Sequence, residues 1–294
     1  TADTGGNTND IQQGVVFTTT GSATSTLNIT GGEQVTLGGS TVDVIDASKS
    51  SGVLNMTGAL AGAGTVKGGS ANDVIVGSGA VDTLEGNGGD DKITGGAGAD
   101  TLTAGAGDDS FVFGATGDLF SNNLLVDTSI NGGSGTDAIA IANNGGATFT
   151  IAAGDTFTGV TSVEKIVAGE ATDTAITITL GDSVYESGIT TVDLSADTTS
   201  TGGNTIDVSA ETGTANGYTL TGSSDVDTIT GGAGDDTIDL VDDSAADIVK
   251  FSGQFGADTL SNFDKSGEDL LDFTAYGVDG NDGLITSVSH ADQE

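Results

Sequence analysis

Aspartate recurs every nine residues between Gly68 and Val112, a stretch that divides into GGSANDVIV, GSGAVDTLE, GNGGDDKIT, GGAGADTLT and AGAGDDSFV. The sixth residue of each nonapeptide is an aspartate, namely Asp73, Asp82, Asp91, Asp100 and Asp109. The glycines before each aspartate let the backbone turn through positive φ and bring carbonyl oxygens close together. Carboxylate and carbonyl oxygens are hard ligands, and an all-oxygen set suits calcium. The spacing therefore predicts turns that ligate calcium.

A large apolar residue occupies the eighth position of every nonapeptide, at Ile75, Leu84, Ile93, Leu102 and Phe111. Residues seven to nine fit a short strand whose eighth side chain points inward by the two-residue alternation. Strands stacked about 4.8 Å apart place each apolar side chain on the one below. The pattern predicts an all-β parallel solenoid. A flexible Gly/Asp linker would not keep aspartate and an apolar residue in one frame over five copies.

This nonapeptide resembles the GGxGxDxUx repeat of the RTX proteins, which bacteria secrete through type I systems. The resemblance implies a parallel β-helix or β-roll with two nonapeptides per turn and several calcium ions held between loops on the same side. On that geometry Asp73, Asp91 and Asp109 line one edge, and Asp82 and Asp100 line the other. The metal-ligand candidates of this block are Gly68, Asn72, Asp73, Asp82, Gly86, Asp90, Asp91, Gly95, Asp100, Asp108 and Asp109. The fifth-position acids Asp90 and Asp108 are either ligands or merely solvated.

Further copies of the repeat follow at a distance. GGSGTDAIA carries Asp137 and Ile139 but has no adjacent loop in the sequence to complete a site. The repeat returns at Gly222 with two-residue insertions, and its ligand candidates are Asp227, Asp236, Asp247, Asp258 and Asp269. We expect Phe263, Asp269 and Phe273 to cap the last coil. The tail after Gly277 shows no pattern of regular structure and no recognisable export signal.

The pattern divides the chain into four sections. These are an N-terminal extension or cap (1–30), a first RTX block (31–113), a calcium-poor solenoid-like section with the isolated repeat (114–221), and a second RTX block with a C-terminal cap (222–294). In the first block, Ala59–Lys67 has Gly64 where aspartate belongs, which predicts a coil without a ligand. Phe113, Phe120, Leu124 and Leu125 are expected to close the end of the first core. The middle section has strand-like alternation, and a small sandwich is the alternative to a continuing solenoid.

The composition is strongly acidic. The chain has 294 residues, 50 glycines, no cysteine and a formal net charge of −37. Self-repulsion of this size opposes compaction, and a bound divalent cation relieves it, so folding should depend on calcium. Weak calcium sites fill outside the cell and stay empty in the cytosol, which predicts a secreted, cell-surface protein. The charge argues against nucleic acid and anionic membranes, and no apolar run approaches the roughly 18 residues that cross a bilayer.

The sequence lacks the usual catalytic groupings. His290 is the single histidine and no arginine occurs, so neither a zinc HExxH site nor a Ser-His-Asp triad can be assembled. Carboxylate pairs of the kind glycosidases use are abundant, but they lie in the calcium frame, and the chain has no tryptophan for sugar stacking. We therefore expect no enzyme. The missing leading methionine and signal pattern suggest a processed product or a fragment.

Among RTX proteins, the chain most resembles the S-layer proteins of the Caulobacter kind. Thr- and Val-Glu-containing segments such as FTGVTSVEKIVAG and GITTVDLSADT carry this part of the resemblance. It implies a structural protein that assembles with copies of itself, and that contacts cell-surface polysaccharide through another region. Two alternatives remain open: a calcium-folded module of a secreted adhesin, fibre or matrix protein, and the non-catalytic part of a secreted hydrolase.

Overall fold

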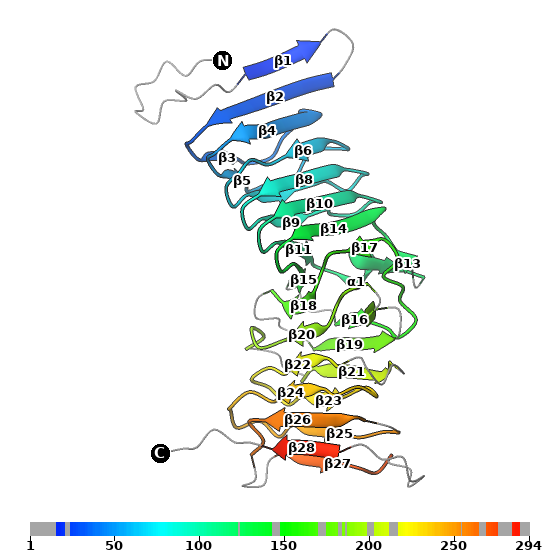
Figure 1. The fold of residues 1–294 in the computed structure, drawn as a ribbon. Coiled ribbons are helices and arrows are strands. Elements are labelled where there is room, and N and C mark those ends of the chain that lie inside the picture. Colours follow the sequence, from blue (N-terminus) through cyan, green and yellow to red (C-terminus); the bar gives the residue numbers. More distant parts are fainter. Residues whose placement is uncertain are drawn as a thin grey trace.

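The computed structural model is one long stack of short strands that coils from the N-terminal to the C-terminal end (Figure 1). It describes residues 16–20, 24–122, 124–142, 148–169, 175–181, 184–185, 187–198, 203–211, 217–253, 255–264, 269–275 and 284–288. Within these ranges the strands of the three large sheets pair in parallel, except where β1 (Val16–Thr20) runs antiparallel to β2 (Thr24–Gly31). The predicted all-β parallel solenoid is confirmed.

Three sheets form the walls of the stack. After β1 and β2, the first sheet contains β4 (Val44–Ser50), β6 (Thr65–Lys67), β8 (Thr83–Gly88), β10 (Thr101–Ala106), β14 (Ser129–Ser134) and β17 (Val160–Thr161). The second sheet contains β3 (Val35–Leu37), β5 (Leu54–Met56), β7 (Val74–Val76), β9 (Lys92–Thr94), β11 (Ser110–Phe113), β15 (Ala138–Ile141), β18 (Lys165–Ala168), β20 (Thr191–Asp193), β22 (Thr219–Thr221), β24 (Thr237–Asp239), β26 (Ala257–Ser261) and β28 (Leu284–Val288). The third sheet contains β16 (Phe149–Ile151), β19 (Ile176–Gly181), β21 (Thr205–Ala210), β23 (Thr228–Thr230), β25 (Ile248–Lys250) and β27 (Leu270–Asp272).

Each coil of the first block consists of two nonapeptides. Thr83 pairs with Thr101 in the first sheet and Val74 pairs with Lys92 in the second. The turn aspartates hydrogen-bond across the same separation of 18 residues. Successive nonapeptides therefore alternate between the two sheets, so their turns fall alternately on the two opposite edges of the stack.

The core is a continuous column of inward side chains. In the second sheet, residues in register occupy the same place in every coil and are at most 1% exposed: Ile75, Ile93, Phe111, Ile139, Ile166, Val192, Leu220, Ile238 and Leu260. Burying each of these side chains stabilises the fold by about 1.5–3 kcal/mol before entropy costs. The column passes through the middle section without a break. That section therefore continues the coil of parallel strands and is not a sandwich.

The coil changes partner sheets near residues 114–160. The first sheet ends at β17 and the third takes over its side of the stack, after an insertion that holds α1 (Thr116–Leu119) and the pair β12 (Phe120–Ser121) and β13 (Leu124–Leu125). Phe120 packs edge-on against Phe157, with ring centroids 5.0 Å apart. The expectation that Phe113, Phe120, Leu124 and Leu125 close a core is wrong: Leu124 is 63% exposed, and further coils follow. The inserted aromatics fill the junction between two sheets instead.

Aromatic side chains and an added strand lie at the C-terminal end of the stack. Phe273 stacks on Phe251 near the C-terminal end, with ring centroids 4.6 Å apart, and Phe263 packs against the core. The tail after Gly277, in which the sequence shows no pattern of regular structure, contributes β28, which pairs in parallel with β26. An edge strand exposes unpaired N–H and C=O groups, which such an added strand satisfies. Within the described residues, no helix is long and apolar enough to span a membrane.

Candidate metal centre

The sixth-position aspartates form two rows along the edges of the stack. Each lies at the end of a turn, directly before the strand that its nonapeptide forms. In one row the backbone N–H of each aspartate donates to Oδ1 of the next: Asp73 to Asp91 (2.7 Å), Asp91 to Asp109 (2.6 Å) and Asp109 to Asp137 (2.8 Å). On the opposite edge Asp82 donates to Asp100 (2.8 Å). Every such carboxylate therefore joins two consecutive coils through its Oδ1.

The second oxygen of several of these carboxylates is buried without a hydrogen-bond partner. Oδ2 is in this state in Asp91, Asp100, Asp109 and Asp137, and these residues are at most 2% exposed. Burial raises the pKa of Asp91 to about 7 and that of Asp109 to about 6, and it also raises the pKa of Asp100 and Asp137. A buried carboxylate oxygen needs a proton, a donor or a cation. The orphaned oxygens therefore fit a metal ion held at the turns.

Backbone oxygen atoms converge on the same places. At the first glycine of the third nonapeptide, Gly86, an added Cβ would meet both Asp91 Oδ2 and the carbonyl oxygen of Ala104. At Gly68 it would meet Asp73 Oδ2 and the Gly86 carbonyl, and at Gly95 it would meet Asp100 Oδ2. In the described part of the chain, no three His, Cys, Asp or Glu side chains gather around one point. The ligand set is therefore one or two carboxylates with backbone carbonyls, which suits calcium and not zinc.

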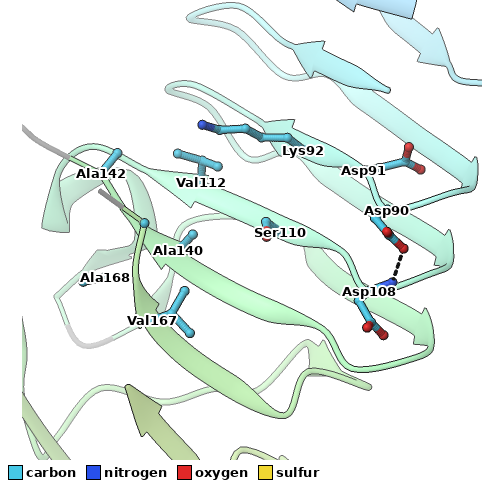
Figure 2. A pocket seen from close by; sticks show the side chains of 11 residues that line it. Asp90, Asp91, Lys92, Asp108, Ser110, Val112, Ala140, Ala142, Val167 and Ala168 are labelled. Carbon is cyan, nitrogen blue, oxygen red and sulfur yellow. Dashed lines mark hydrogen bonds between the residues drawn. The ribbon is translucent and has the colours of Figure 1, made fainter. Parts of the chain in front are cut away.

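The fifth-position residues make a second, outer row. Asp90 N–H donates to Asn72 Oδ1 (2.9 Å), Asp108 N–H to Asp90 Oδ1 (2.9 Å) and Thr136 N–H to Asp108 Oδ1 (2.8 Å). Figure 2 shows Asp90 and Asp108 one above the other at the turn edge. Their side chains support the backbone of the next coil from the solvent side. Both side chains are exposed, and Asp90 Oδ2 also accepts a hydrogen bond from Asn72 Nδ2 (3.3 Å).

The isolated repeat around Asp137 has neighbours in space that it lacks in sequence. β14 pairs with β10, so Gly133 lies beside Gly105, and Asp109 N–H reaches Asp137 Oδ1 across 28 residues. The inserted residues form the junction described above and leave the stacking of turns intact. The adjacent loop that this repeat lacks in the sequence is therefore supplied in space by the turn of Asp109.

The second block continues both rows with longer turns. Asp227 N–H donates to Asp247 Oδ1 (2.8 Å) and Asp247 N–H to Asp269 Oδ1 (3.0 Å), while on the other edge Asp236 N–H donates to Asp258 Oδ1 (3.0 Å). The separation grows from 20 to 22 residues because the two-residue insertions lie in the turns. The strands keep their register despite these insertions.

Three residues that the sequence analysis did not single out extend the rows. Asp137 N–H donates to Glu164 Oε2 (2.8 Å), Ile176 N–H to Asn204 Oδ1 (2.7 Å) and Asp100 N–H to Asp127 Oδ1 (3.0 Å). Glu164 and Asn204 stand two residues before a buried isoleucine, the same offset as in the nonapeptide, and this signal could have found them. Asp127 lacks that offset because one extra residue precedes its strand.

Asn204 replaces the carboxylate with a neutral network. Its Nδ2 donates to Asp197 Oδ2 (3.0 Å) and Ser223 Oγ (3.1 Å), and all three residues are at most 2% exposed. The Asn204 amide N–H thus gives the Asp197 carboxylate the donor that a bound cation would replace at the unpartnered turn carboxylates. The middle section is therefore joined by protein hydrogen bonds at this coil.

Replacing Gly86 with alanine is expected to destabilise the calcium-bound protein by about 1–3 kcal/mol, the usual cost of overpacking. The new methyl group would press on the Asp91 carboxylate and on the Ala104 backbone. Ala104 is buried at the same first position of its own nonapeptide. The first position can therefore hold alanine in another turn, and the close approach belongs to Gly86 and not to every first position. Thermal unfolding in calcium measures the effect. Gly114→Ala is the control, because nothing lies within 4 Å of its added Cβ, and equal losses in both variants would contradict the expectation.

Comparison with known proteins identifies the repeats. The family model of the RTX calcium-binding nonapeptide repeat matches residues 59–93, 76–111, 85–119 and 219–241. Neither the curated proteins nor the solved structures contain a significant match. The matched segments cover the turns of Asp73, Asp82, Asp91, Asp100 and Asp109, and those of Asp227 and Asp236. Both Gly/Asp-rich blocks of the chain thus carry RTX calcium-binding nonapeptide repeats.

Proposed function

We propose that the chain is a structural protein of a bacterial cell surface, which folds on binding extracellular calcium and assembles with copies of itself into an S-layer-like lattice. The observation that carries the proposal is the row of buried, unpartnered carboxylate oxygens at Asp91, Asp100, Asp109 and Asp137. These oxygens leave the rod incomplete until a cation binds, because an uncompensated buried charge is costly. Calcium then supplies positive charge where the backbone supplies carbonyl ligands.

The shape of the molecule supports a structural role. One apolar column joins the coils from Ile75 to Leu260, so the stack is a long rod with two flat sides (Figure 1). Its net charge of −37 keeps copies apart unless cations neutralise the acidic edges. Asp90 and Asp108 face solvent along one edge, where calcium can bridge neighbouring rods. Assembly would then respond to the same ion as folding.

A non-catalytic role is part of the proposal. The hollow in Figure 2 lies on the outward face of the second sheet, where Val112, Ala140 and Val167 are in register with one another and Ser110 is in register with Lys92. Its polar side chains are Ser110, Lys92 and the turn carboxylates of Asp90, Asp91 and Asp108. The neighbouring carboxylate of Asp91 accepts a backbone hydrogen bond and belongs to the metal row. Secretion, exposure at the cell surface and contact with surface polysaccharide through another region complete the proposed role.

Negative-stain electron microscopy of the purified chain tests the proposal. We expect ordered sheets in millimolar calcium and none in chelator. Magnesium at the same concentration is the control, and it should not replace calcium because it demands tighter octahedral geometry. Dispersed rods in calcium would contradict self-assembly and would favour a module of an adhesin or of a secreted hydrolase. Identical particles with calcium and with chelator would contradict the dependence on calcium itself.

A further inference from the structure

Eight of the nonapeptide turns fall into two conformational classes. In four turns the N–H of the second residue donates to Oδ2 of the turn's own aspartate: Gly69 to Asp73 (2.6 Å), Ser78 to Asp82 (2.6 Å), Ser223 to Asp227 (2.5 Å) and Gly232 to Asp236 (2.7 Å). We name these the closed turns. In the four open turns, which end at Asp91, Asp100, Asp109 and Asp137, Oδ2 is buried and has no partner. The same sequence position therefore holds two chemically different carboxylates.

Backbone conformation separates the two classes without exception. The second and fourth residues of every open turn have positive φ, namely Asn87, Gly89, Gly96, Gly98, Gly105, Gly107, Gly133 and Gly135. None of the corresponding residues of the closed turns does: Gly69, Ala71, Ser78, Ala80, Ser223, Asp225, Gly232 and Gly234. Reversing the sign of φ at the second residue turns its N–H away from the carboxylate and lets a carbonyl oxygen face it. Open turns thus present oxygen to the site, and closed turns present N–H.

Side chains explain three of the four closed turns. Ala71, Ala80 and Asp225 occupy the fourth position, where residues other than glycine avoid positive φ. The fourth case shows that glycine alone does not open a turn. GGAGDD at Gly231–Asp236 differs from GGAGAD at Gly95–Asp100 only at the fifth residue, yet Gly232 donates to Asp236 and Gly96 does not donate to Asp100.

The neighbouring coil accounts for this exception. An added Cβ at Gly96 would meet the backbone of Ser78 in the nonapeptide turn one coil earlier, whereas an added Cβ at Gly232 would meet the carbonyl oxygens of Val208 and Glu211. The turn of Asp236 therefore packs on residues outside the nonapeptide frame, whereas the turn of Asp100 packs on another nonapeptide.

We propose that calcium binds the carboxylates of the four open turns, at Asp91, Asp100, Asp109 and Asp137, and that those of the four closed turns do not ligate it. The inference rests on calcium binding in the proposed function and selects among its sites. In a closed turn the carboxylate already holds two backbone N–H donors, and N–H groups that converge on one point favour an anion over a cation. The second-block repeats at 219–241 thus keep the motif and use its aspartates as hydrogen-bond acceptors.

Calcium bound per chain, measured by equilibrium dialysis, tests the proposal with charge-matched variants. The open set replaces Asp91, Asp100, Asp109 and Asp137 with asparagine, and the closed set replaces Asp73, Asp82, Asp227 and Asp236 in the same way. We expect the open set to lose most of its bound calcium. The closed set should keep the wild-type amount but melt at a lower temperature, because an amide nitrogen cannot accept the Gly69 or Ser78 N–H. Equal losses of calcium in the two sets would overturn the proposal.

Single substitutions and measurements on the wild-type chain keep the proposal testable if the fourfold variants do not fold. Asp100→Asn and Asp236→Asn change nearly identical turns, and only the first should reduce bound calcium. Hydrogen exchange of the wild-type protein should show calcium protecting residues 95–100 more than residues 231–236, and equal protection would count against the assignment. Asp225 and Asp243 lie on the opposite edge of the stack from Asp236. The comparison of Asp100→Asn with Asp236→Asn therefore does not involve them. A wild-type chain that binds no calcium would overturn both the assignment and the proposed function, whereas missing lattices alone would leave the assignment standing.

Discussion

Replacing Asp91 and Asp100 with alanine is expected to raise the calcium concentration at which β-structure appears by about tenfold or more. Each carboxylate accepts a backbone hydrogen bond from the preceding coil, at 2.7 and 2.8 Å, and each presents a buried oxygen to the metal. Hydrogen bonds to charged groups contribute about 1.5–3 kcal/mol each, and about 1.4 kcal/mol corresponds to a factor of ten. One variant residue lies on each edge of the stack, so neither row of turns stays complete.

A calcium titration followed by far-ultraviolet circular dichroism measures this shift. The control variant replaces Asp46 and Asp193, which also removes two negative charges but leaves the rows of turn aspartates intact. Among the residues that the structure describes, each control residue accepts hydrogen bonds from the serine two positions later and takes no part in the rows. An equal shift in the control would mean that net charge, and not ligation, sets the calcium requirement. Unchanged β-structure of the parent chain in chelator would refute the coupling of folding to calcium altogether.

The sequence was sufficient to predict the path of the chain where the nonapeptide frame is kept. An aspartate followed two residues later by an apolar residue places a turn and an inward side chain, and Asp91 with Ile93 shows both. The same offset at Glu164 and Ile166 carries the coil through the middle section. Short-range alternation is enough for this, because each coil contacts only its neighbours.

Other features depend on contacts that the local pattern does not encode. The turns at Gly95–Asp100 and Gly231–Asp236 have nearly the same sequence but opposite peptide orientations, and different residues pack on them: Ser78 on Gly96, and Val208 with Glu211 on Gly232. Asp127 joins the row only because Asp100 carbonyl accepts two successive N–H groups, from Thr128 at 2.7 Å and Ser129 at 3.4 Å, and so absorbs the extra residue. The strand β28 lies in a tail without a repeat and forms because β26 offers it an edge.

Acidification of the metal-free protein is expected to stabilise its fold. Burial raises the pKa of Asp91, Asp127, Asp247 and Asp258 to about 7 and that of Asp109 and Asp227 to about 6, from an ordinary value of 3.8. The folded chain therefore binds protons that the unfolded chain releases. This contribution to stability is complete below the unfolded pKa and is lost as the pH rises through about 6 to 7. The pKa values of Asp43, Asp46 and Asp272 shift the other way, because Ser25, Ser48 and Thr274 donate hydrogen bonds to these carboxylates, but they are fewer than the aspartates whose pKa is raised.

The corresponding measurement is thermal unfolding in chelator between about pH 5 and pH 8, a range set by those pKa values. We expect the melting temperature to fall as the pH rises, and the calcium requirement to increase as the pH drops, because a proton and calcium compete for one carboxylate. The variant with asparagine at Asp91 and Asp109 keeps most of the negative charge of the chain but loses two of the raised-pKa carboxyls. If general self-repulsion were the cause, this variant would titrate like the wild type. If the buried turn carboxylates are the cause, its melting temperature should depend less on pH, and calcium should stabilise it less at every pH.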